Sequence, residues 1–116
     1  MFKILAFLTK KEGIGTPAFI DYYENRHVPL ICSLAPPPLV YKRRYLVEGE
    51  KLTQEGGAVD FDVVTELAFP DRAAYLAWMA QLSRPGAGEQ VAADEAMFLD
   101  RSRTRAYAIE EHVTSG

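Results

Sequence analysis

The sequence predicts an α+β fold in which helices cover one face of a four-stranded antiparallel sheet. Four segments have the alternating or clustered apolar pattern of strands, and helical periodicity interrupts them in the order β-α-β-β-α-(α)-β. The first strand is apolar on both faces, so both faces need a cover. The 116 residues suffice for one domain with one core, which we assign to residues 1–116.

The first predicted strand covers residues 2–9 and ends in a polar turn that contains Gly13. Its residues from Phe2 to Leu8 alternate between two faces, and the second face carries Leu5 and Phe7. Helices would cover one face. We expect a second copy of the chain to cover the other, because an exposed apolar sheet face favours association into a homodimer.

The first helix is predicted over residues 16–30, with Thr16 as its N-cap and Pro17 in its first turn. We expect it to weaken near Val28, because the residue before a proline disfavours helical backbone angles. Its buried face follows a 3.6-residue period. That face carries Phe19, Tyr22, Tyr23, Arg26, His27 and Leu30.

The later elements follow from the same two periodicities. In order, they are a stiff connection over Pro36–Pro38, a strand over 39–48, a polar hairpin loop over 49–59, a strand over 61–69, a helix capped by Asp71, a shorter helix over 89–99 and a strand over 102–113. This order is that of the split βαβ, ferredoxin-like sandwich.

Two parts of the chain also resemble the EthD family, which is named for a protein of ethyl tert-butyl ether degradation. The residues that carry the resemblance are Lys10-Lys11-Glu12-Gly13, Phe19, Tyr22-Tyr23, His27-Val28-Pro29-Leu30, Ala93-Asp94-Glu95 and Phe98-Leu99-Asp100. Together with the order of elements, the resemblance covers nearly the whole chain. It implies ferredoxin-like subunits that pair into a dimeric α+β barrel. It implies no single reaction, since one fold serves many chemistries.

Composition excludes several classes of function. The net charge of −3 gives no reason to expect a nucleic acid or an anionic membrane as a partner, and no apolar run approaches the ~20 residues that span a bilayer. The apolar N-terminus reads as a strand, because Lys10 and Lys11 follow it without a cleavage site. The single Cys32 allows no internal disulfide, so a cytoplasmic location is expected.

His27 is the first candidate for a catalytic residue, with Tyr23 one helical turn before it. An imidazole can take or release a proton near neutral pH, and this one lies on the face of a helix that should pack on the sheet. The structural alternative is a histidine that only hydrogen-bonds the last carbonyls of its helix. The resemblance favours the functional reading, because the matching histidine is part of the family pattern.

The acids that could assist His27 are Asp62, Asp94 and Glu95. Asp94 and Glu95 share a helix face with Val91 and Phe98, and one of them could orient the imidazole. The alternative is that this helix buries Ala92, Ala96 and Leu99 instead. Asp62 and Glu66 share one face of the third strand, where they would either enter the pocket or pair with arginines of the second strand.

Candidate ligand-binding residues lie on the second strand and among the aromatic residues of the helices. An arginine between tyrosines suits an anionic or phenolic ligand, although such residues are also common on half-exposed strands. Aromatic residues at helical spacing are more often part of the core. The candidates are Phe19, Tyr41, Arg43, Tyr45, Trp78 and Phe98.

Metal and cofactor motifs are absent from the sequence. It has no Gly-rich phosphate loop and no CxxC, HxxxH or HExxH pattern, so we predict no metal and no cofactor. His112 reads as a surface residue. The spacing of Cys32 from His27, across Pro29, disfavours a nucleophilic pair.

The leading hypothesis is a small cofactor-independent enzyme that binds a hydrophobic, oxygenated ligand, such as an aromatic, polyketide-like or lactone compound, between sheet and helices. His27 would act as acid or base in an isomerisation, a dehydration or an oxygenation. The resemblance extends to polyketide-tailoring enzymes, to muconolactone isomerases and to proteins labelled oxidoreductases. The main alternative is a non-catalytic dimeric accessory module of an oxygenase or degradation pathway. Haem handling is a third hypothesis.

Overall fold

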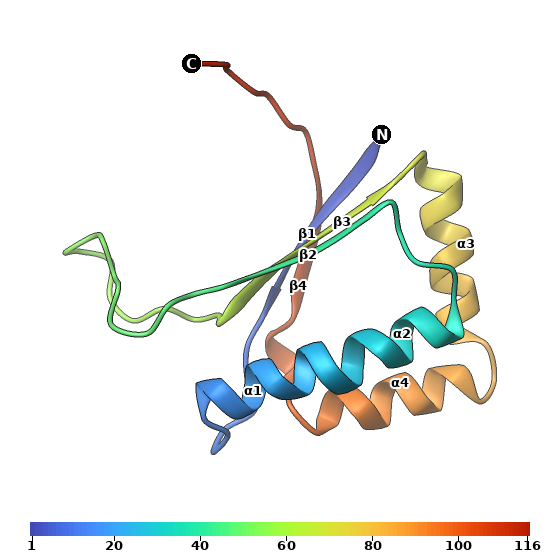
Figure 1. Cartoon of the computed structure of the whole chain (residues 1–116), viewed down its shortest axis with the longest axis horizontal. Helices are drawn as coiled ribbons and strands as arrows, with labels where there is room; N and C mark the ends of the chain where they lie inside the picture. The colour runs from blue at the N-terminus through green and yellow to red at the C-terminus, as the bar shows by residue number, and fades with distance from the viewer.

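The computed structural model describes residues 1–116 as a four-stranded antiparallel sheet with its helices on one side (Figure 1). The strand order across the sheet is β2-β3-β1-β4. The elements are β1 (Phe2–Leu8), α1 (Thr16–Tyr22), the π-helical turn η1 (Tyr23–His27), α2 (Val28–Leu34), β2 (Val40–Tyr45), β3 (Val63–Phe69), α3 (Arg72–Ser83), α4 (Ala87–Ala96), the 3₁₀ turn η2 (Arg101–Arg103) and β4 (Arg105–Ile109). The predicted α+β class and element order are confirmed.

Each predicted strand forms, but each is shorter than its sequence pattern suggested. The largest difference is at β4, which begins at Arg105 instead of Ser102. The Asp100 carboxylate accepts hydrogen bonds from the backbone N–H and the hydroxyl of Ser102, and this contact forms the 3₁₀ turn before the strand. The local cap therefore overrides the alternating pattern at this point.

The first helix is longer than predicted and contains one wide turn. It continues through α2 to Leu34, and its buried residues recur every four positions. These residues are Phe19, Tyr23, His27, Ile31 and Ala35. An α-helix rotates about 100° per residue, so a four-residue repeat drifts by about 40° at each step. The π-helical turn takes up one extra residue, which offsets the drift and keeps the repeat facing the sheet.

Pro29 accounts for the position of the wide turn. In a regular α-helix its ring would clash with the carbonyl four residues earlier. Here the Val28 N–H donates to the Tyr23 carbonyl, five residues back, and this wider spacing opens the turn just before the proline. The prediction that the helix weakens near Val28 is confirmed only in part: the α-helical hydrogen bonding is interrupted over Tyr23–His27, but the helix continues to Leu34.

Of the two N-caps predicted from the sequence, the structure confirms one, at α3, and not the other, at α1. Gly15, not Thr16, is the N-cap of α1, because the Thr16 hydroxyl bonds instead to the Glu48 carboxylate and to Lys10 Nζ. Asp71 caps α3 as predicted, since its carboxylate accepts from the Ala74 N–H at 2.8 Å.

Arg26, which was expected on the buried face of the first helix, is exposed.

The two faces of the sheet have different environments. The helices pack over the face that carries Ile4 and Leu8, both of which are buried. No helix covers the opposite face, where the Phe7 ring contacts Phe61 and Tyr107 with centroids 5.2 and 6.2 Å apart. The loop between β2 and β3 and the C-terminal segment extend away from the helical layer (Figure 1). None of the helices has the length and hydropathy needed to cross a membrane.

Candidate functional site

His27 lies at the end of the wide turn, with its ring in the space between the helices and the sheet. Its side chain is 7% exposed, and its Nδ1 lies 2.8 Å from Oδ2 of Asp94 on α4. A carboxylate can only accept, so Asp94 fixes Nδ1 as the protonated nitrogen. Nε2 has no partner in the protein, and the ring lines a cavity. In this tautomer of the neutral ring, the lone pair of Nε2 is available for a proton from a bound molecule.

The second oxygen of Asp94 is held as firmly as the first. Tyr22 donates its hydroxyl to Asp94 Oδ1 at 2.7 Å, and its ring stacks on Phe98 at 5.1 Å. Burial and the hydrogen bond to Asp94 raise the pKa of Tyr22, so it remains a donor at neutral pH. With both oxygens engaged, Asp94 cannot rotate freely, and the orientation of His27 is fixed.

The cavity beside His27 has a volume of about 470 Å³ and is mainly apolar. Side chains from β1, β3, α2, α3 and α4 contribute to its wall. Its polar groups from the sheet and first helix are few, namely His27, Tyr23, Tyr41 and Thr65. A large apolar space with a few polar groups is the usual form of a site for a small organic ligand.

Tyr23 and Thr65 form the second polar contact of this wall. Their hydroxyl oxygens lie 2.7 Å apart, and the rings of Tyr23 and His27 meet edge to face at 5.4 Å. Burial raises the pKa of Tyr23 and also that of Tyr41. Both phenols therefore stay protonated at neutral pH and can donate a hydrogen bond to a ligand oxygen.

The structure brings together part of the predicted site. His27, Tyr23, Tyr41, Trp78 and Glu95 line the cavity. Asp94 lies behind the imidazole. The two fully buried phenylalanines, Phe19 and Phe98, pack in the core, and Phe98 contacts the His27 ring at 5.0 Å. The helix face that carries Val91, Glu95 and Phe98 points inward. Of the alternative face, Ala92 lines the cavity and Leu99 is buried, and only Ala96 is exposed.

Arg43 and Tyr45 do not line the cavity. The Arg43 guanidinium donates to both carboxylate oxygens of Glu24, at 2.9 and 2.5 Å, and Tyr45 donates to the same carboxylate at 2.5 Å. These hydrogen bonds from Arg43 lower the pKa of Glu24. The cluster ties the first helix to β2, so the observed contacts give Arg43 and Tyr45 a structural role.

Asp62 and Glu66 are also separate from His27. Asp62 precedes β3 and accepts a hydrogen bond from the backbone N–H of Lys10 at 2.7 Å. Glu66 lies on the uncovered sheet face and pairs with Arg44 of the neighbouring strand at 3.0 Å, which is the cross-strand alternative considered above.

Two residues of the site were not chosen from the sequence. Thr65 lies on the third strand, but a threonine in a strand carries no signal of function. Arg101 lines the cavity and pairs with Glu95 at 3.2 Å. It lies between the helix predicted over 89–99 and the strand predicted over 102–113, where no pattern marked it. The chain has no cluster of three or more histidine, cysteine or acidic side chains placed to hold a metal ion. His112 is exposed and lies 2.5 Å from Glu110.

Solved structures with the same fold come from several organisms. Protein At3g17210 of Arabidopsis thaliana aligns with a TM-score of 0.65 at 16% identity, over 99% of each chain. An ethyl tert-butyl ether degradation (EthD) family protein of Bacillus halodurans aligns at 0.61 and 21% identity, over 97% of this chain and 100% of the other. A DABB family protein of Mesorhizobium loti, described as ferredoxin-like, aligns at 0.58 and 12% identity, over 99% and 97%.

Comparison by sequence identifies the family of the chain, whereas the solved structures show only its fold. No curated protein sequence matches the chain. The family model of the EthD domain matches residues 11–102, a segment that contains both His27 and Asp94. The chain therefore belongs to the EthD family.

Proposed function

We propose that this protein is a cofactor-independent enzyme that binds a hydrophobic, oxygenated molecule between its sheet and helices. His27 is the acid or base of the reaction, and Asp94 is the positioning residue that holds its ring. The observation that carries the proposal is the buried contact of 2.8 Å between His27 Nδ1 and Asp94, which leaves Nε2 at the wall of the cavity.

The character of the cavity defines the class of ligand. Its mainly apolar wall suits an aromatic, polyketide-like or lactone body, and the hydroxyls of Tyr23 and Tyr41 can bind an oxygen of that body. Nε2 would take a proton from an acidic C–H or O–H of the ligand. The resulting anion would be stabilised by the phenol donors, as in other sites that place donors where charge develops.

This first step is common to three reactions. Return of the proton to another carbon gives an isomerisation, and loss of hydroxide as water gives a dehydration. Attack of the anion on molecular oxygen, which would be a second substrate, gives an oxygenation. We favour the proton transfer itself as the function of His27, and the choice among the three outcomes depends on the ligand.

A thermal-shift titration with a turnover assay tests the proposal. The panel contains aromatic lactones, anthrones and simple phenols, with haemin as a comparison compound. We compare the wild type with His27→Ala and His27→Gln, and His112→Ala is the control because the second histidine is exposed. We expect one class to stabilise all four proteins, and only the His27 variants to lose turnover by 10²-fold or more.

Other outcomes would lead to a different function. If compounds bind but His27→Gln converts them as fast as the wild type, His27 is not the acid or base. If nothing binds and the His27 variants only lose stability, the protein is better described as a non-catalytic dimeric accessory module. If haemin is the only compound that stabilises the protein, the result would favour haem handling.

We further propose that two copies pack through the uncovered sheet face to form the dimeric α+β barrel. The support is the apolar surface there, which includes Leu5, Phe7 and the half-exposed Tyr107. Leu5→Arg should convert the dimer to a monomer in sedimentation velocity. Gln81→Arg, which adds the same charge on the helical side, should not. A wild-type monomer would refute the proposal.

A further inference from the structure

Trp78 carries the one buried side-chain polar atom that has no hydrogen-bond partner. Its indole Nε1 is out of reach of water and of every acceptor in the protein. A buried donor without a partner destabilises a protein by about 1–3 kcal/mol, so such groups are rare and call for a physical explanation. By comparison, the buried hydroxyl of Tyr23 and the Nδ1 of His27 both have partners.

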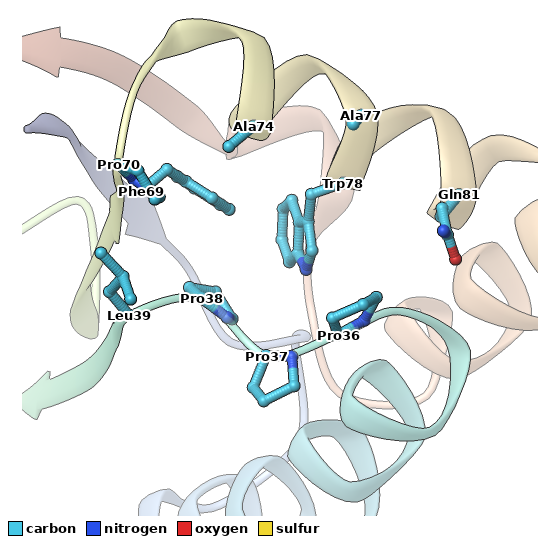
Figure 2. Close-up of a pocket in the computed structure, with 10 residues that line it drawn as sticks. All are labelled: Pro36, Pro37, Pro38, Leu39, Phe69, Pro70, Ala74, Ala77, Trp78 and Gln81. Carbon is cyan, nitrogen blue, oxygen red and sulfur yellow. The ribbon is translucent and has the colours of Figure 1, made fainter.

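The position of Trp78 is also unusual. It is the only residue that lines both the cavity beside His27 and a second, outer groove of about 330 Å³. In Figure 2 the indole hangs from α3 across this groove, with its nitrogen edge turned toward the segment that carries Pro36, Pro37 and Pro38. The indole is therefore part of the wall that separates the two spaces.

The surroundings explain why the protein does not satisfy this N–H. The indole packs on the Phe69 ring at 5.3 Å and against the apolar cluster of Ile31, Ala35 and Leu82. Gln81, the polar side chain in the groove, does not bond to it. Because the indole also lines the inner cavity, a rotation of its ring would turn the N–H from the proline segment toward a molecule bound in that cavity.

We propose that the indole N–H of Trp78 is a ligand-binding donor that recognises an acceptor oxygen, such as a ketone or lactone carbonyl, on the molecule in the inner cavity. The inference rests on the proposed function and narrows its substrate class. The ligand would be an apolar ring system with two oxygen functions, one facing His27 and the other facing α3. Binding would give a partner to the one buried side-chain polar atom that the protein leaves unpaired, which makes Trp78 a specificity-determining residue.

The test uses two tricyclic probes that differ by one carbonyl, namely xanthone and xanthene. Isothermal titration calorimetry compares the wild type with a protein in which 3-benzothienylalanine replaces Trp78. This change is confined to one residue because the chain has a single tryptophan. It exchanges N–H for sulfur and preserves the shape of the ring. Xanthone should bind the wild type about tenfold more tightly than xanthene, and the substituted protein should lose this preference.

The fluorescence of Trp78 gives a second readout in the unmodified protein. Xanthone, but not xanthene, should shift its emission to longer wavelength as the N–H gains an acceptor. If both probes bind equally, or if the preference survives the substitution, the inference is overturned while the proposed function stands. If neither probe binds and no compound of the His27 panel binds, both are overturned.

Discussion

Replacing Asp94 with alanine gives the most direct test of the proposed site, because its effect can be calculated without knowledge of the reaction. Asp94 is 14% exposed and accepts two hydrogen bonds, one from His27 and one from Tyr22. The substitution leaves the buried Nδ1–H of His27 without a partner, which costs about 1–3 kcal/mol. Loss of the partly buried bond from Tyr22 adds about 0.5–1.5 kcal/mol.

We therefore expect Asp94→Ala to lower the free energy of unfolding by about 1.5–4.5 kcal/mol. For a domain of this size, the melting temperature should fall by roughly 10 °C. The assay is urea denaturation of the wild type, Asp94→Ala, Tyr22→Phe and the double variant. The cycle should show a coupling energy of about 0.5–1.5 kcal/mol between the two residues, because they share one bond.

The control is Glu12→Ala, which removes an exposed acid and should change stability by less than about 0.5 kcal/mol. Nitrogen NMR of the imidazoles adds an independent readout, since the chain has only two histidines. When its ring is neutral, His27 of the wild type should carry the proton on Nδ1, and Asp94→Ala should remove this preference. If Asp94→Ala is as mild as Glu12→Ala and the tautomer is unchanged, Asp94 does not position His27.

Two other predictions concern the framework of the site. Glu24→Gln should cost about 1–2 kcal/mol at pH 7, because Arg43 and Tyr45 then donate to a neutral amide instead of a carboxylate. Arg43 lowers the pKa of Glu24 in the folded protein, so its stabilisation is present above the ordinary glutamate pKa of about 4.3 and is lost as the pH falls below it. Urea denaturation from pH 7 to pH 3 should therefore show the difference between wild type and Glu24→Gln shrinking at low pH, and a constant difference would contradict this reasoning. Phe98→Ala should lower the free energy of unfolding by about 3–5 kcal/mol, because the ring is fully buried against Phe19 and His27. Met97→Ala, at the exposed neighbouring position, should be nearly neutral. Similar losses of stability from the two substitutions would mean that Phe98 is not in the core.

The fold class and element order could be predicted because each depends on local patterns. The alternation in β1 and the cap at Asp71 act over a few residues, and the structure retains both. Two of the differences in the first helix have separate causes. A 3.6-residue period was applied where the buried residues repeat every four, so Arg26 was placed on the buried face. The rule for residues before a proline ended the predicted helix at Leu30, whereas the helix continues to Leu34.

The contacts of the site that the sequence could not predict join residues that are far apart in the chain. Periodicity places Asp94 and Glu95 on the same face, because they are adjacent, and cannot say which one meets a helix 67 positions earlier. The angle at which α4 crosses the first helix decides this, and it directs Glu95 to Arg101 instead. Alternation likewise groups Arg43 with Tyr41 and Tyr45 on one face of β2, but the presence of Glu24 opposite it depends on tertiary packing. Asp62 precedes β3, so alternation along the strand does not place it.

The wide turn at Tyr23–His27 has a consequence for comparing related sequences. It contains one residue more than a regular α-helical turn, and a relative without it would need a gap of one position in the middle of a helix. Alignment methods usually penalise gaps inside helices and would shift the register by one residue on one side instead. Such a shift would align either His27 or Tyr23 with the neighbouring residue of the relative, whose side chain points about 100° away around the helix. A single-residue gap next to Pro29 is therefore the expected mark of an equivalent histidine in a distant relative.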